Sequence, residues 1–158
     1  MLKAMPHILK VHSNLKLFIA GMDEGELDKL IDLSKELKIQ DNIEFVGQLD
    51  SDNKNCFLKH AQCLVMPSHT ENFGIVAVEA LFQNTPVIAS KHTPWEILET
   101  EQAGFHIINT PQVISQAVIT ILKDILFYSK NTSRVVEQFS WSKIAKTYKS
   151  TLLKISKR

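Results

Sequence analysis

Two glutamates on either side of a glycine turn are the residues of this 158-residue chain whose types and spacing best suit chemistry. Glu71 lies just before Phe73-Gly74, and Glu79 follows Glu71 with seven residues between them. Gly74 permits a tight turn, and the apolar residues from Ile75 onward have helical spacing. The free N–H groups of a helix's first turn, together with the helix dipole, favour a phosphate. The sequence therefore predicts a phosphate site at this turn.

The two carboxylates would repel a phosphate if they faced it, so they suit hydroxyl groups on either side of it. A carboxylate accepts hydrogen bonds from sugar hydroxyls. Glu79, on a helix, suits the ribose of a nucleotide, and Glu71, on the loop, suits a transferred sugar. The alternative is that Glu71 is a surface residue and Glu79 is a salt-bridge partner on its helix.

Five short segments are predicted to be the strands that position this turn. They are rich in β-branched or aromatic residues and end at Gly, Pro or Ser. They lie at residues 15–21, 43–47, 63–67, 86–90 and 104–108. Because most are apolar nearly throughout, they suit parallel strands that are covered on both faces.

Apolar residues recur with helical spacing between and after these strands. Helices are predicted at residues 27–37, 113–125 and 141–155, and residues 1–11 look like the middle of a helix. Asp23 and Glu26 have capping-box spacing, and Thr110 and Ser140 suit helix N-caps. The alternation predicts an α/β fold, a Rossmann-like open parallel sheet with helices on both faces. Ligands bind such sheets beyond the carboxyl ends of the strands, which is where the glutamate turn falls.

Composition narrows the class of protein. The chain has the length of one domain, 44% hydrophobic residues and a formal net charge of +1, which favours neither nucleic acid nor an anionic membrane. No apolar run approaches the roughly 20 residues that span a bilayer. Cys56 and Cys63 are expected to be free, reduced and buried. Ser68 lacks a nucleophile elbow, and the histidines lack metal-ligand spacing. His69 and His92 are interpreted as solvated loop residues, and Trp95 and Trp141 as packing residues.

The glutamate segment resembles the group 1 (family 4) retaining glycosyltransferases, which use nucleotide-sugar donors. The resemblance rests on Glu71-Asn72-Phe73-Gly74 followed by Glu79-Ala80-Leu81. Further matches are Pro67-Ser68, residues 85–90, the loop at 91–96, Ile19-Ala20-Gly21, residues 43–47 and Phe139-Ser140-Trp141. Nearly the whole chain matches in order. The implied fold is the C-terminal half of a GT-B fold, so residues 1–158 would form a single donor-binding domain.

The resemblance also implies roles for individual residues. Glu71 would place the anomeric carbon of the donor sugar, which makes it the expected catalytic residue, and Glu79 would hold the ribose hydroxyls. The other expected donor-binding residues are Asn72, Phe73, Gly74, Ile75, Gly21, Val46, Gly47 and Lys91. No metal and no cofactor is expected beyond a UDP- or GDP-linked donor sugar. Transfer of a hexose would retain configuration through an oxocarbenium-like state, without a protein nucleophile.

Departures from the family pattern lead to further expectations. The acceptor-binding N-terminal domain has no counterpart here, nor do the first strand and the basic pair that bind the diphosphate. Lys91 is the only basic residue near the motif that would partly substitute. We therefore expect an incomplete, N-terminally truncated enzyme with an unpaired sheet edge or apolar face near its N-terminus, where it self-associates or meets a partner chain.

The acceptor, a saccharide or a lipid-linked group, would bind the missing half. A role in polysaccharide biosynthesis would suit such a protein. The expected location is the cytoplasm, including peripheral attachment to the inner membrane through the missing half, with no nucleic-acid partner. The alternatives are a non-catalytic binding or assembly module and, more distantly, a hydrolase or epimerase.

Overall fold

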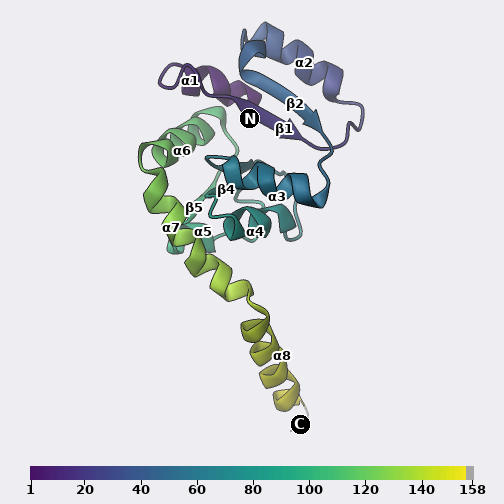
Figure 1. Ribbon diagram of the computed structural model, residues 1–158, viewed down its shortest axis with the longest axis vertical. Helices are drawn as coiled ribbons and strands as arrows, with labels where there is room; N and C mark the ends of the chain where they lie inside the picture. The colour runs from purple at the N-terminus through teal and green to yellow at the C-terminus, as the bar shows by residue number, and fades with distance from the viewer. Residues whose placement is uncertain (156–158) are drawn as a thin grey trace.

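The computed structural model describes residues 1–155 and has the predicted α/β architecture (Figure 1). Each observed strand falls within a predicted segment. The strands are β1 Leu17–Ala20, β2 Ile43–Gly47, β3 Leu64–Met66, β4 Val87–Ser90 and β5 Gly104–Ile107. All pair in parallel, which confirms the predicted fold class.

Residues 1–155 also contain eight α-helices, of which α1 precedes the first strand. They are α1 Met5–Leu9, α2 Leu27–Glu36, α3 Ser51–His60, α4 Ile75–Phe82, α5 Ile97–Thr100, α6 Pro111–Lys123, α7 Ile125–Val136 and α8 Trp141–Ile155. Short 3₁₀ turns lie at Leu2–Ala4, Gln40–Asn42 and Glu137–Phe139. Helix α3 was not predicted, because few of its residues are apolar.

The helix ends depart from the predictions in two places. The Asp23 carboxylate accepts from the N–H groups of Gly25, Glu26 and Leu27, but the Glu26 side chain pairs with Lys29, so there is no capping box. The helix predicted at residues 113–125 is α6 and ends at Lys123, and α7, which the Asp124 side chain caps, was not predicted. The predicted cap at Thr110 is confirmed by its bond from the Val113 N–H at 3.3 Å.

The strands form two sheets rather than one continuous sheet. Strands β1 and β2 pair with each other, and β3, β4 and β5 form a second sheet with β4 in the middle. In Figure 1 the β1–β2 pair lies above α3, and β4 and β5 lie to the left of α3. Strands β1 and β3 are therefore both edge strands.

The core forms on both faces of β4, whose four residues are all buried. Ile88 faces a cluster that includes Met5 of α1 and Ile121 of α6. The neighbouring residues Val87 and Ala89 face a second cluster, built around α4 and the loop that follows β4. The period-two alternation of a strand thus serves two hydrophobic layers.

Helix α8 projects from this body and has no buried residue (Figure 1). Its predicted apolar stripe is present but exposed: Trp141 is 84% exposed and Tyr148 is 68% exposed. The prediction that Trp141 is a packing residue is wrong, because no described part of the chain covers that face. Trp95 is 0% exposed, which confirms the corresponding prediction.

Candidate functional site

Gly74 is required at the turn for two reasons. Its φ of +73° is left-handed, a conformation that L side chains adopt at a cost. A Cβ atom at this position would lie 2.8 Å from the sulfur of Met66, the last residue of β3. The turn therefore presses the start of α4 against the carboxyl end of a strand, as predicted.

The backbone N–H groups at the start of α4 are free. Among the described residues, no group accepts a hydrogen bond from the N–H groups of residues 73–76. The first hydrogen bond of the turn runs from the Ala77 N–H to the Gly74 carbonyl at 2.9 Å. These N–H groups and the helix dipole give the turn the means to bind an anion.

An aromatic cluster holds the loop in place. The indole N–H of Trp95 donates to the carbonyl oxygen of Phe73 at 2.6 Å. The rings of Phe73, Trp95 and Phe139 lie 5.5–5.7 Å apart, centroid to centroid. Phe73 is still 42% exposed, so it packs only in part. This anchoring fixes the peptide that precedes Gly74.

The loops that follow β3, β4 and β5 are pinned to one another. The Asn109 amide donates to the carbonyl oxygens of Pro67 and Ser68, at 2.9 and 3.2 Å. A ring nitrogen of the buried His106 lies 2.9 Å from the Thr93 carbonyl oxygen. These bonds restrain the carboxyl edge of the second sheet around the turn.

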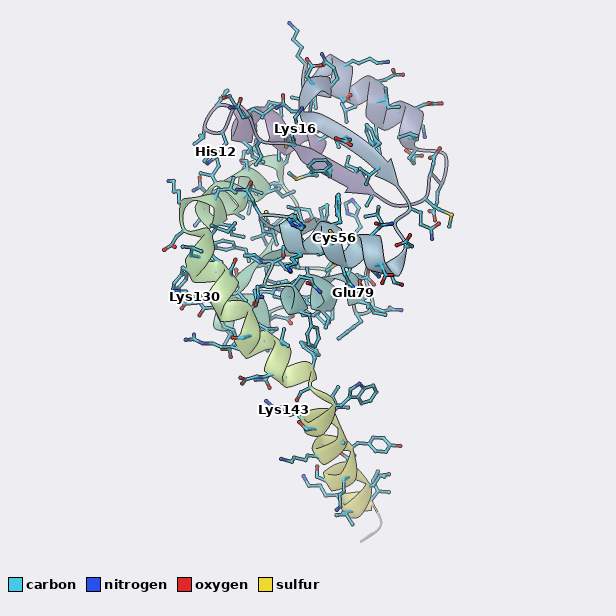
Figure 2. All side chains as sticks on the ribbon, in the orientation of Figure 1. His12, Lys16, Cys56, Glu79, Lys130 and Lys143 are labelled. Carbon is cyan, nitrogen blue, oxygen red and sulfur yellow. The ribbon has the colours of Figure 1, made fainter. Side chains whose placement is uncertain are left out.

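Glu79, on α4, forms an ion pair with a residue of another helix. Its Oε1 lies 2.6 Å from Nζ of Lys54, on α3, and the two side chains are 27% and 34% exposed. Figure 2 shows Glu79 where α4 lies beside α3. Oε2 has no partner among the described residues and stays available as an acceptor. The prediction that Lys91 is the only basic residue near the motif is wrong, because Lys54 contacts Glu79 directly.

The other predicted residues fall at the same edge of the sheets. Glu71 is half-buried, and its Cγ lies 3.3 Å from the position of a Cβ on Gly74, so it covers the turn. Asn72 and Ile75 are exposed beside it. Lys91 is exposed, and its backbone N–H donates to the Ile107 carbonyl at 2.8 Å.

The first sheet brings a second group of predicted residues to this edge. Gly21 and Gly47 lie side by side at the carboxyl ends of β1 and β2. The Gly21 N–H donates a hydrogen bond to the Gly47 carbonyl oxygen at 2.9 Å. Val46, beside them, is half-buried. Gly21 lines the same cavity as Lys54 and Val76, which connects the first sheet to the start of α4.

The remaining candidate side chains carry little chemistry. Burial raises the pKa of the Cys63 thiol to about 12, so this thiol is protonated near neutral pH. Cys56 is exposed on α3, which corrects the prediction that both cysteines are buried. His69 and His92 are exposed loop residues, as predicted.

Residues 1–155 contain no group of three His, Cys, Asp or Glu side chains that could hold a metal. Within the same residues, no helix is both long and apolar enough to cross a bilayer.

Comparison with known proteins agrees with this arrangement. Residues 1–139 match the family described as "Glycosyl transferases group 1". The chain is 37% identical over 152 residues to an uncharacterized glycosyltransferase of Methanocaldococcus jannaschii, covering 92% of this chain and 38% of that protein. It thus spans about two fifths of the length of this relative.

Solved structures show the same fold. Sucrose-phosphate synthase from Thermosynechococcus elongatus superposes with a TM-score of 0.78 at 24% identity, covering 98% of this chain and 42% of that one. TarM from S. aureus, solved in complex with UDP, gives 0.80 at 18% identity, covering 94% and 31%. At these identities the structures support the fold, and the family match covers most of the sequence. This chain therefore belongs to the group 1 glycosyl transferases.

Proposed function

We propose that residues 1–158 form the donor-binding domain of a transferase that moves a hexose from a nucleotide-diphosphate sugar to an acceptor, with retention and without a metal. The observation that carries the proposal is the set of free N–H groups at residues 73–76, which Glu71 precedes and Glu79 follows in the sequence. Sequence similarity to a group 1 family supports the class of reaction.

Each part of the site has a distinct task in this proposal. The free N–H groups bind the diphosphate and stabilise the charge that develops as it leaves. The available oxygen of Glu79 accepts a hydrogen bond from a ribose hydroxyl, while Lys54 fixes the carboxylate from the other side. Glu71 accepts from hydroxyls of the donor sugar and orients its anomeric carbon.

The bond between the anomeric carbon and the diphosphate oxygen breaks, and an acceptor hydroxyl attacks from the same face. The leaving diphosphate takes the acceptor proton. No protein nucleophile takes part, and the positive charge on the sugar ring is transient. The acceptor, a saccharide or a lipid-linked group, binds to polypeptide outside residues 1–158. The relative from Methanocaldococcus is long enough to include such a region.

Titration calorimetry with UDP-glucose and GDP-mannose tests the proposal. One of them should bind, and Glu79→Ala should weaken binding at least about tenfold, because hydrogen bonds to a charged group contribute about 1.5–3 kcal/mol. Glu99→Ala, which removes an exposed carboxylate on α5, is the control and should leave the affinity unchanged. Absence of binding at millimolar ligand would instead favour a non-catalytic assembly module, in which the Lys54–Glu79 pair is purely structural.

A further inference from the structure

Helix α8 has an apolar face that no described part of the chain covers. Its apolar side chains recur at intervals of three and four residues, so they share one face of the helix. They are 42–84% exposed, and they are Trp141, Ile144, Tyr148, Leu152 and Ile155. A continuous apolar stripe on an exposed surface marks a binding site for a partner.

The opposite face of α8 is basic. Helical spacing places four lysines there, and the helix contains no acidic residue; the lysines are Lys143, Lys146, Lys149 and Lys154. Leu153 is the one large apolar residue of α8 on this side. None of the lysines forms an ion pair with another described residue, and Lys143 donates to the neutral side chain of Gln138. Their positive charges are therefore not compensated within residues 1–155.

Charge is unevenly divided along the whole sequence. Residues 141–158 contain six of the eighteen basic residues and none of the seventeen acidic residues, which leaves twelve basic against seventeen acidic residues in 1–140. The net charge of +1 is thus the difference between a segment of +6 and a remainder of −5. An anionic surface attracts the segment and repels the remainder, so it would orient the molecule with α8 toward that surface.

The two faces of α8 together distinguish three classes of partner. A second copy of α8 would bring two strongly basic helices together, and like charges repel. A nucleic acid would bind the lysines but leave the apolar stripe in water. A bilayer with anionic lipids suits both faces, because acyl chains cover the stripe and headgroup phosphates attract the lysines. The rings of Trp141 and Tyr148 also suit the boundary between headgroups and acyl chains.

The length of α8 indicates how it would meet a bilayer. Its 15 residues are fewer than the roughly 20 that span the hydrocarbon core. A short helix with one apolar and one basic face lies in the plane of the membrane surface. We propose that α8 binds the surface of an anionic lipid bilayer in this way, with its apolar stripe inserted and its lysines at the headgroups. This inference rests on α8 and does not depend on donor binding.

Co-sedimentation of the full chain with lipid vesicles tests the proposal. Vesicles of phosphatidylcholine with about one third phosphatidylglycerol should bind the protein at least about tenfold more tightly than vesicles of phosphatidylcholine alone. Raising the salt concentration from about 0.1 M to about 1 M should remove most of this difference, because the Debye length falls from about 10 Å to about 3 Å.

Charge reversal tests the basic face. The triple variant Lys143→Glu, Lys146→Glu and Lys149→Glu should weaken binding to the anionic vesicles at least about tenfold. A matched control reverses three exposed lysines elsewhere, and these changes are Lys10→Glu, Lys59→Glu and Lys130→Glu. The control alters the net charge by the same amount and should weaken binding less than about threefold, since these lysines lie outside α8.

A double variant tests the apolar face. Trp141→Ser with Tyr148→Ser should weaken binding to the anionic vesicles at least about fivefold, because less apolar surface is inserted. Both side chains are exposed, so the urea midpoint of unfolding should not change, which shows that the variant is folded.

Several results would overturn the proposal. They are equal binding to both kinds of vesicle, equal weakening by the two triple variants, and unchanged binding by the double variant. Absence of vesicle binding would overturn it as well. If light scattering then showed a dimer that requires residues 141–158, the apolar stripe would be assigned to a contact between copies of the chain.

Discussion

The ion pair between Lys54 and Glu79 shows how one side chain prepares another for a ligand. Both side chains are about one third exposed, and ion pairs in such settings contribute about 0.2–1 kcal/mol to stability. Their larger effect is on geometry. With Oε1 held by Lys54 at 2.6 Å, the other carboxylate oxygen has a fixed direction.

Lys54→Met separates these two effects. We expect the free energy of unfolding, measured with urea, to fall by no more than about 1 kcal/mol. The affinity for the donor should fall about tenfold in calorimetry, because Glu79 loses its fixed orientation. Lys59→Met, at an exposed position of the same helix, is the matched control and should change neither quantity. Tighter donor binding by Lys54→Met would mean that this lysine competes with the ribose.

The sequence predicted the glutamate turn because its information is local. Glu71, Gly74 and Glu79 lie within nine consecutive residues, and the spacing of Ile75 onward places them at the start of a helix. Lys54 was missed because it lies 25 residues before Glu79, on a helix that the apolar pattern does not reveal. The Asp50 cap, which accepts from the Asn53 N–H at 2.9 Å, was the one local signal of that helix.

At the scale of elements, glycine positions determine how closely strands and turns approach. A Cβ atom on Gly104 would lie 1.8 Å from the Val87 carbonyl oxygen, a backbone atom of the neighbouring strand. Val87 cannot retreat without breaking the pairing of β4 with β5. At Gly74 the nearest atom instead belongs to the flexible Met66 side chain.

Gly104→Ala should therefore destabilise the protein by more than about 3 kcal/mol or prevent folding, since it forces two backbones apart. Gly25→Ala is the control, with a left-handed φ of +94° and nothing within 4 Å of the added Cβ. It should cost only about 1–2 kcal/mol, the strain of the backbone alone. Urea unfolding of both variants measures the difference, and equal costs would show that the strands adjust easily.

Elements with a long and regular apolar pattern were predicted well, and interruptions were not. Helices α2, α6 and α8 follow clear apolar stripes. The predicted stripe ran past Asp124 to Ile125, and α7 was missed although the Asp124 carboxylate accepts from the Phe127 N–H and starts this new helix. A single capping side chain therefore marks a helix boundary that the apolar spacing does not reveal.

At the scale of the whole molecule, the sequence predicted parallel strands but not their division into two sheets. Each strand shows its apolar character locally. Which strand edges remain unpaired depends on whether strands far apart in the sequence, such as β1 and β3, come into contact in the fold. The predicted unpaired sheet edge corresponds to the free sides of β1 and β3, each of which pairs with one strand only.

Helix α8 gives a prediction at this scale. Deleting residues 141–158 should change the free energy of unfolding by less than about 0.5 kcal/mol, because no residue of α8 is buried. Circular dichroism should still show loss of the corresponding helical signal. Val135→Ala, at a fully buried position on α7, should cost more and serves as a control. A loss of several kcal/mol on deletion would mean that α8 packs on the body in solution.

The bond between the Trp95 indole and the Phe73 carbonyl gives the glutamate turn a built-in optical reporter. Trp95 is shielded from water, whereas Trp141 is 84% exposed, so the two indoles should emit at different wavelengths and respond differently to iodide. In a Trp141→Phe background, the remaining emission comes from the residue that anchors the turn. Binding of a ligand to the neighbouring N–H groups should then change the emission of Trp95, so it can be measured without an added label.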